Sequence, residues 1–180
     1  RMDELELLFL GTGTSAGIPM IGCGCDVCTS PDPKDKRCRC SVVIRYGDTQ
    51  VLVDTTPELR LQCVTHDVQR IDAIVFTHAH ADHIMGLDDC RRFNYIKGGA
   101  LDVWADSATF RSLQQCFGYA FIEPSPEMKV FRPHLEHREI TGAFQIGGVT
   151  WMPIPLIHGN QPVLGFRIGK LAYCTDVSFI

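Results

Sequence analysis

The sequence lacks the features of a membrane-inserted or exported chain. No apolar run in its 180 residues approaches the roughly 20 residues needed to span a bilayer. The first stretch, RMDELELLFLG, is too acidic for a secretory signal, and its apolar part is too short. We therefore expect no membrane partner and a cytoplasmic location, where the nine cysteines would be thiols or metal ligands.

Runs of basic residues are also missing. Lys and Arg total 17 against 21 Asp and Glu, which gives a net charge of −4. A nucleic acid would have to bind against this average field, so the composition disfavours a nucleic-acid partner. There is no internal repeat and no low-complexity linker. We expect a single domain over 1–180, because two domains at this length would both be small.

Short apolar runs rich in β-branched and aromatic residues predict a chain dominated by strands. The turns Gly47-Asp48 and Gly169-Lys170 predict two hairpins. Helical periodicity fits 57–66, 84–96 and 107–118. The predicted strands are 5–11, 41–47, 50–54, 72–77, 101–105, 149–157, 163–169 and 170–174. Strands with interspersed helices indicate an α/β or α+β sandwich.

The stretch THAHADH, at 77–83, follows the buried run DAIVFT. It holds His78, His80, Asp82 and His83, and imidazoles with a carboxylate suit zinc, iron or manganese. Residues at this spacing can diverge within a turn, so that two His bind one ion while Asp82 and His83 bind a second. The alternative is a polar loop with solvated histidines. The density of ligands directly after one strand favours metal binding.

Three more polar residues stand at the ends of apolar runs. His158 follows WMPIPLI, Asp176 follows KLAYCT, and Asp54 ends VLVD. A lone residue of this kind usually caps a turn. Ligands from separate strands can meet at one edge of an α/β sheet, which favours His158 and Asp176 as further ligands. We expect Asp54 to accept hydrogen bonds from a ligand His or from loop N–H groups.

Other cysteines and histidines are expected to be structural. His134 and His137 lie in an alternating polar stretch, which predicts surface positions. Four cysteines occur in apolar helix or strand contexts and are expected in the core: Cys63, Cys90, Cys116 and Cys174.

The motifs resemble the metallo-β-lactamase superfamily over nearly the whole chain. THAHADH matches its HxHxDH signature, and LGTGTSAGIPMIGCGCDVC resembles the phosphodiesterase family of the carbon–phosphorus lyase pathway. The resemblance implies an αββα sandwich with two divalent metals, Zn or Mn, at the common edge of both sheets. It implies that His78, His80 and His158 bind the first metal. Asp82 and His83 would bind the second metal, and Asp176 would bridge the two.

The resemblance also implies a mechanism. Asp82 and Asp176 would act in catalysis by holding and orienting a metal-bridging hydroxide for in-line attack on phosphorus. The family supplies one more His to the second metal, and a general-acid His, from a C-terminal segment. No residue here matches either one, so we expect the C-terminal part of the fold to be missing from this sequence.

The stretch CGCDVC contains Cys23, Cys25 and Cys28. Three thiols exceed what a redox C-x-x-C pair requires, whereas a structural zinc needs four ligands. Cys38 and Cys40 are local alternatives for the fourth ligand, and in the resembling family that ligand is a His near the C-terminus. Unrelated thiols are the remaining alternative. We expect one structural Zn in a Cys-rich loop at about 20–40, beside the active edge.

The sequence thus predicts a dinuclear-metal-dependent hydrolase. Its expected partner is a small phosphodiester, such as a linear or cyclic sugar phosphate. A ribonuclease Z-like endonuclease would share the metal core but needs an extended basic arm. A binding or carrier protein of a cofactor pathway would share the fold with a degraded cluster. Homodimerisation, frequent in the superfamily, stays open.

Overall fold

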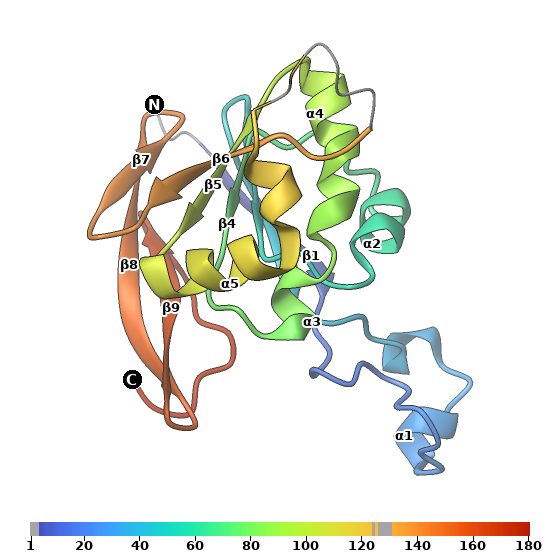
Figure 1. The fold of residues 1–180 in the computed structure, drawn as a ribbon. Helices are drawn as coiled ribbons and strands as arrows, with labels where there is room; N and C mark the ends of the chain where they lie inside the picture. Colours follow the sequence, from blue (N-terminus) through green and yellow to red (C-terminus); the bar gives the residue numbers. More distant parts are fainter. Residues whose placement is uncertain (1–3, 124, 126–130) are drawn as a thin grey trace.

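A computed structural model describes residues 4–123, 125 and 131–180. Two β-sheets pack face to face, and helices cover the outer face of the first sheet (Figure 1). The first sheet contains, in spatial order, β1 (Leu5–Gly11), β2 (Ser41–Tyr46), β3 (Thr49–Val53), β4 (Ala73–Val75), β5 (Leu101–Ala105) and β6 (Leu135–Glu139). The second contains β10 (Leu171–Tyr173), β9 (Gln161–Ile168), β8 (Val149–His158) and β7 (Phe144–Ile146).

The helices of the described residues are short. They are α1 (Asp26–Thr29), α2 (Leu59–Thr65), α3 (Ala81–Ile84), α4 (Arg91–Lys97) and α5 (Ser107–Phe117), with 3-10 turns at Pro33–Asp35, Leu87–Cys90 and Gly118–Phe121. None of the described helices is long and apolar enough to cross a membrane.

The first sheet supplies two separate cores because successive side chains of a strand point to opposite faces. Val43 and Leu52 pack under the helices. Val42 faces the second sheet and belongs to the cluster of Trp151 and Phe166. A sheet buried on both faces explains why its strands read as continuous apolar runs in the sequence. The chain therefore builds an α/β/β arrangement, and the predicted sandwich is confirmed.

Strand direction brings several strand ends to one edge. β1, β2 and β3 are antiparallel, whereas β3, β4, β5 and β6 run parallel. The second sheet is antiparallel throughout. Both predicted hairpins are present, between β2 and β3 and between β9 and β10. Because β3 and β4 are parallel, the residues that follow them meet at the same edge of the sheet.

The helix predicted over 84–96 is broken. Its residues fall into the end of α3, a 3-10 turn and α4. Gly86 lies at the break, where its N–H donates to the Thr55 carbonyl at 3.0 Å. A Cβ on Gly86 would overlap the Thr56 carbonyl oxygen, so the loop after β3 approaches the chain at a point where only glycine fits.

Two strands, two histidines and one cysteine differ from expectation. β6 and β7 were not predicted, since they are short and interrupted by polar residues. His137 lies in β6 rather than on an open surface, and its ring stacks on Phe110 with centroids 3.6 Å apart. His134 is also half-buried. Cys116 is exposed, because it lies on the outer side of α5.

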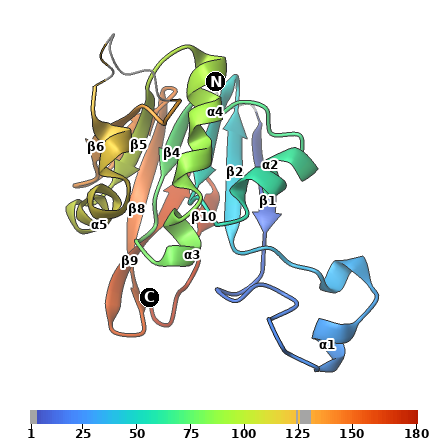
Figure 2. The same ribbon diagram turned by 45° about the vertical axis from the view of Figure 1, so that its right-hand side comes forward.

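Residues 12–40, here called the arm, project from the sandwich (Figures 1 and 2). Backbone hydrogen bonds close its base, from Gly13 N to Cys38 O at 2.8 Å and from Ile18 N to Arg37 O at 2.9 Å. The tip has no buried residue, and Ile21 is fully exposed. The arm thus lacks a hydrophobic core of its own.

Candidate metal centre

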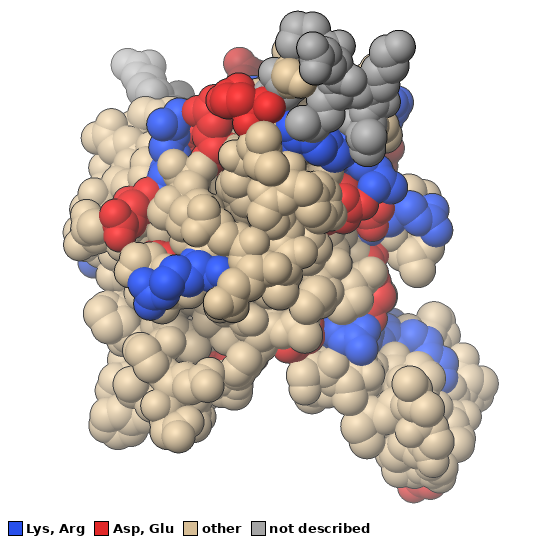
Figure 3. Space-filling model, viewed as in Figure 1, with Lys and Arg blue, Asp and Glu red and all other residues tan. Residues whose placement is uncertain are grey.

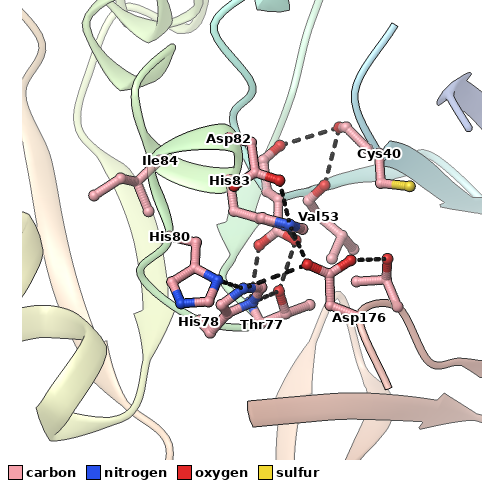
Figure 4. A network of polar contacts seen from close by, with 12 residues as sticks. Cys40, Val53, Thr77, His78, His80, Asp82, His83, Ile84 and Asp176 are labelled. Atoms are coloured by element: carbon pink, nitrogen blue, oxygen red, sulfur yellow. Dashed lines mark hydrogen bonds and ion pairs between the residues drawn. The ribbon is translucent and has the colours of Figure 1, made fainter. Parts of the chain in front are cut away.

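Histidine and aspartate side chains gather where β3, β4, β8 and β10 end. Two residues separate the HAHADH run from the end of β4, and His80 occupies the N-cap position of α3, which carries Asp82 and His83. His158 is the last residue of β8, and Asp176 follows β10. Figure 4 shows the imidazoles of His78, His80 and His83 converging on the carboxylate of Asp176. The structure thus brings the residues of separate strands to one point.

The first group comprises His78, His80, His158 and Asp176, with one ligand atom of each within 4.8 Å of the others. His78 Nε2 lies 3.0 Å from His80 Nδ1. Asp176 Oδ2 lies 3.6 Å from His78 Nε2 and 3.7 Å from His158 Nε2. Three imidazole nitrogens and a carboxylate oxygen form a donor set that suits a divalent transition metal.

The second group comprises Asp82, His83 and Asp176. His83 Nε2 lies 3.3 Å from Asp82 Oδ2 and 3.1 Å from Asp176 Oδ2. The same oxygen, Asp176 Oδ2, therefore contacts both groups. A carboxylate in this position can bridge two cations, and the three residues fit a second divalent ion.

A buried carboxylate holds the second group from behind. Asp54 is fully buried, and its Oδ2 lies 2.7 Å from His83 Nδ1. It also accepts hydrogen bonds from the backbone N–H of Thr77 at 2.8 Å and from the Thr77 hydroxyl at 2.7 Å. His83 Nδ1 is thereby occupied, which turns Nε2 toward Asp82 and Asp176.

Sequence reasoning missed two partners of the histidines. The Thr77 hydroxyl lies 3.0 Å from His78 Nδ1, and Gln161 Oε1 lies 2.9 Å from His80 Nε2. Thr77 precedes the HxHxDH signature, and Gln161 follows His158 across a tight turn. Their positions next to candidate ligands in the sequence were the signal that could have identified them as hydrogen-bond partners.

The backbone is strained at two site residues. Asp54 has φ = 62° and Asp176 has φ = 52°, in the left-handed region that favours glycine. Asp is among the few residues that tolerate this conformation. Strained residues persist where the surrounding structure holds them, which is common at functional sites.

Charge is distributed unevenly among the histidines. Burial, together with the neighbouring His83, lowers the pKa of His78 to about 4. Burial also opposes charge on His83, but the Asp54 and Asp176 carboxylates outweigh it and raise its pKa to about 11. The hydrogen bond from His83 lowers the pKa of Asp176 to about 2. Carboxylates that favour a proton on His83 equally favour a metal cation beside them.

The arm carries a third group. The sulfurs of Cys23, Cys25 and Cys28 lie within 4.8 Å of one another, as a metal clasp requires. Hydrogen bonds, of which the one from the Cys28 backbone contributes most, lower the pKa of Cys25 to about 7. Neither Cys38 nor Cys40 joins this group among the described residues. Cys40 instead donates to the Gly13 carbonyl at 3.2 Å and lies near the Asp176 side of the cluster (Figure 4).

The six residues of the two groups, here called the histidine cluster, are His78, His80, Asp82, His83, His158 and Asp176. Asp82 and His83 belong to α3, and the molecular surface is hollowed near this helix (Figures 1 and 3). In the space-filling view, the lower edge is notched between two projections (Figure 3). One projection is the hairpin of β8 and β9, and the other is the arm, with α3 between them (Figure 1). A molecule that enters this notch would meet α3, on which Asp82 is partly exposed and His83 is buried.

The chain belongs to the family described as the beta-lactamase superfamily domain, whose family model matches residues 49–180. The matched segment includes every residue of the histidine cluster. The structure has the metallo-β-lactamase fold, as predicted.

Particular relatives are more informative. A solved structure described as a new diphosphatase from the PhnP family is 41% identical, with a TM-score of 0.88 over 98% of this chain and 67% of that chain. A curated octanoyltransferase from Porphyromonas gingivalis (strain ATCC BAA-308 / W83) is 35% identical over 98% of this chain. Zn(2+)-bound PqqB from Methylobacterium extorquens is 15% identical, with a TM-score of 0.69 over 94% of this chain and 63% of that chain, and shows the fold alone. The chain spans only 35% of the length of the curated relative.

Proposed function

We propose that this chain is a dinuclear-metal-dependent hydrolase that cleaves a small phosphodiester. The residues 1–180 would form one domain, with the Cys-rich arm attached beside the active edge. His78, His80 and His158 would hold the first divalent metal, while Asp82 and His83 would hold the second. The bridge is assigned to Asp176.

The position of Asp176 carries this proposal. One oxygen of its carboxylate lies 3.1 Å from His83 Nε2 and 3.6 Å from His78 Nε2. A mononuclear site has no need for a carboxylate shared by two groups of ligands. Two metals in close proximity are typical of enzymes that hydrolyse phosphate esters. The similarity to a PhnP-family diphosphatase supports chemistry at phosphorus.

The residues of the cluster have distinct tasks. Divalent metals held here supply Lewis acidity, which acidifies water and neutralises charge on phosphoryl oxygens. Asp82 and Asp176 present carboxylate oxygens that orient the attacking water and accept its hydrogen bonds. Asp54 and Thr77 keep the imidazoles of His83 and His78 in place.

The three thiols of the arm would hold one structural Zn. Their mutual distances support this role, and so does the missing core of the arm, since a zinc clasp can order a loop that buries little apolar surface. The fourth ligand lies outside the three cysteines.

The arm offers little support for a ribonuclease Z-like function, which would need a basic surface for RNA. Its cations Lys34, Lys36, Arg37 and Arg39 are accompanied by Asp26, Asp32 and Asp35. Arg39 pairs with Glu58, and Arg37 donates to Thr12. Cations already engaged within the protein contribute less to binding RNA phosphates. The octanoyltransferase named as a relative gives no support for acyl transfer by this chain, because the chain covers only 35% of that protein.

The test is a hydrolysis assay of the purified, metal-loaded protein. The panel is bis(p-nitrophenyl) phosphate, a cyclic sugar phosphodiester and a nucleoside diphosphate. We expect turnover of a phosphodiester and a loss of at least about 100-fold in kcat for Asp82→Asn. The control is Asp89→Asn, outside the cluster, which should behave as the wild type.

Two results would contradict the proposal. One is a folded, metal-loaded wild type that hydrolyses none of the phosphodiesters. The other is an Asp82→Asn protein as active as the control. Cleavage of the diphosphate alone would replace the phosphodiester by a phosphoanhydride as the substrate class.

A further inference from the structure

Each imidazole of the HxHxDH signature has a partner on the nitrogen that faces away from the cluster. His78 Nδ1 faces the Thr77 hydroxyl, and His83 Nδ1 faces the Asp54 carboxylate. His80 is different, because its outer nitrogen is Nε2 and the partner comes from another sheet, as Gln161 Oε1 at 2.9 Å. The inner nitrogen of His80, Nδ1, points at His78 (Figure 4).

A tight hairpin delivers Gln161 to this position. Gln161 begins β9 and pairs with His158, the last residue of β8. Between them lie only Gly159, with φ = 63°, and Asn160. The N–H of Gly159 donates to the Ser178 hydroxyl at 2.9 Å, which anchors the turn. One hairpin therefore supplies both a candidate ligand and the partner of a second candidate ligand.

Burial explains why His80 needs this partner most. His78 is 5% exposed and His83 is 1% exposed, so packing restrains both rings. His80 is only half-buried, and its bond to Gln161 is open to solvent. An exposed imidazole can rotate about its side-chain bonds unless a hydrogen bond holds it. Within the described residues, its other polar contact is His78, a member of the cluster itself.

We infer that Gln161 is a positioning residue that holds His80 for metal binding. Its amide oxygen accepts the Nε2–H of His80, which leaves the lone pair on Nδ1 and aims it at the first metal position. The inference rests on the metal ligands of the proposed function, but not on the reaction they perform.

The orientation of the Gln161 amide follows from the same network. If the amide nitrogen faced His80, it would need the lone pair of Nε2, and the proton of His80 would then stand on Nδ1. That proton would point at His78 Nε2 and block metal binding. A carboxylate at position 161 can only accept, so Gln161→Glu tests the assignment directly.

The experiment measures metal binding on the purified protein, after metal removal, by Zn²⁺ competition with a chelator and by Co²⁺ absorption. Gln161→Leu should weaken the first Zn²⁺ site about 10-fold, the lower end of the effect of removing a histidine's partner, because this bond is solvent-exposed. Its Co²⁺ spectrum should change in shape. Gln161→Glu should bind Zn²⁺ at least as tightly as the wild type. The control is Asn160→Ala, in the same turn, which should have the Zn²⁺ affinity of the wild type.

Two outcomes would overturn the inference. If Gln161→Leu keeps wild-type Zn²⁺ affinity and Co²⁺ spectrum, the ring needs no positioning. If Gln161→Glu is as weak as Gln161→Leu, the acceptor is not the relevant feature. Circular dichroism of each variant before metal is added shows whether the variant is folded, so that neither outcome is confused with misfolding. Metal binding is read without substrate, so a wild type without phosphodiesterase activity would refute the proposed reaction and leave this test intact.

Discussion

Asp54 and His83 form a buried pair, in which Oδ2 of the carboxylate lies 2.7 Å from Nδ1 of the imidazole. At most 1% of either side chain is exposed. Asp54 stands at the end of β3 and His83 on α3, so the pair ties two parallel-strand loops together. Backbone bonds run beside it, with Thr55 N donating to His83 O at 2.7 Å. The ligand helix is thereby attached to the sheet at the point where its imidazole turns toward the cluster.

We predict that Asp54→Asn lowers metal affinity at the second site by about 10- to 100-fold, the usual effect of removing a partner of a ligand histidine. Asn tolerates the positive φ of this position, so the backbone should be retained. The measurement is Zn²⁺ stoichiometry and affinity by calorimetry. Asp67→Asn is a matched control, since Asp67 has φ = 52° and is exposed. Equal affinities in the two variants would refute the role of Asp54.

We predict that the triple change of Cys23, Cys25 and Cys28 to Ser removes one Zn per chain and leaves the other metals bound. The reason is that the three sulfurs form a group separate from the histidine cluster. Elemental mass spectrometry counts the metals, and hydrolysis per folded protein should persist. Cys116→Ser, at an exposed cysteine outside the group, should change nothing. A triple variant that keeps every ion would exclude the clasp.

We predict that Gly86→Ala destabilises the protein by about 2–4 kcal/mol, because the added methyl group would overlap the Thr56 carbonyl oxygen and force the packed loop to move. Since Gly86 follows α3, metal affinity at Asp82 and His83 should fall as well. Urea unfolding measures the first effect and Zn²⁺ binding the second. Gly99→Ala has open space around its Cβ and serves as the control. A wild-type unfolding midpoint for Gly86→Ala would disprove the close approach.

We predict that Tyr46→Phe costs about 1–3 kcal/mol of folding free energy, because two buried polar groups lose their partner. The Tyr46 hydroxyl donates to Ile146 O at 3.0 Å and accepts from Trp151 Nε1 at 3.0 Å, which joins the two sheets. Chemical denaturation measures the change. Tyr95→Phe, at a side chain 67% exposed, should be neutral.

The same tyrosine predicts a pH dependence. Burial raises the pKa of Tyr46 from its ordinary value of about 10 to about 12, so folding favours the protonated phenol. Its stabilising contribution is complete below pH 10 and is lost as the pH rises toward 12. Stability measured from pH 9 to 11.5 should therefore fall more steeply for the wild type than for Tyr46→Phe. Parallel curves would show that Tyr46 does not titrate in this way.

Local patterns sufficed for most of the architecture. The buried strands read as apolar runs because both faces of the first sheet are covered, and the hairpins read as Gly-containing pairs. The break at Gly86 was not visible, because it depends on the approach of a loop about 30 residues earlier in the chain. β6 escaped notice because Leu135 is its only apolar residue, so the strand shows neither an apolar run nor an alternating pattern.

By itself, the sequence determined which side chains offer metal-binding chemistry and that they stand at strand ends, because dense ligand motifs and apolar runs are local features. Only the tertiary structure decided that Asp176 lies between His78 and His83 and that Gln161 faces His80. Those contacts join residues about 80 to 100 positions apart, and they depend on strand register and on the packing of one sheet against the other. No periodicity in the chain encodes such distances.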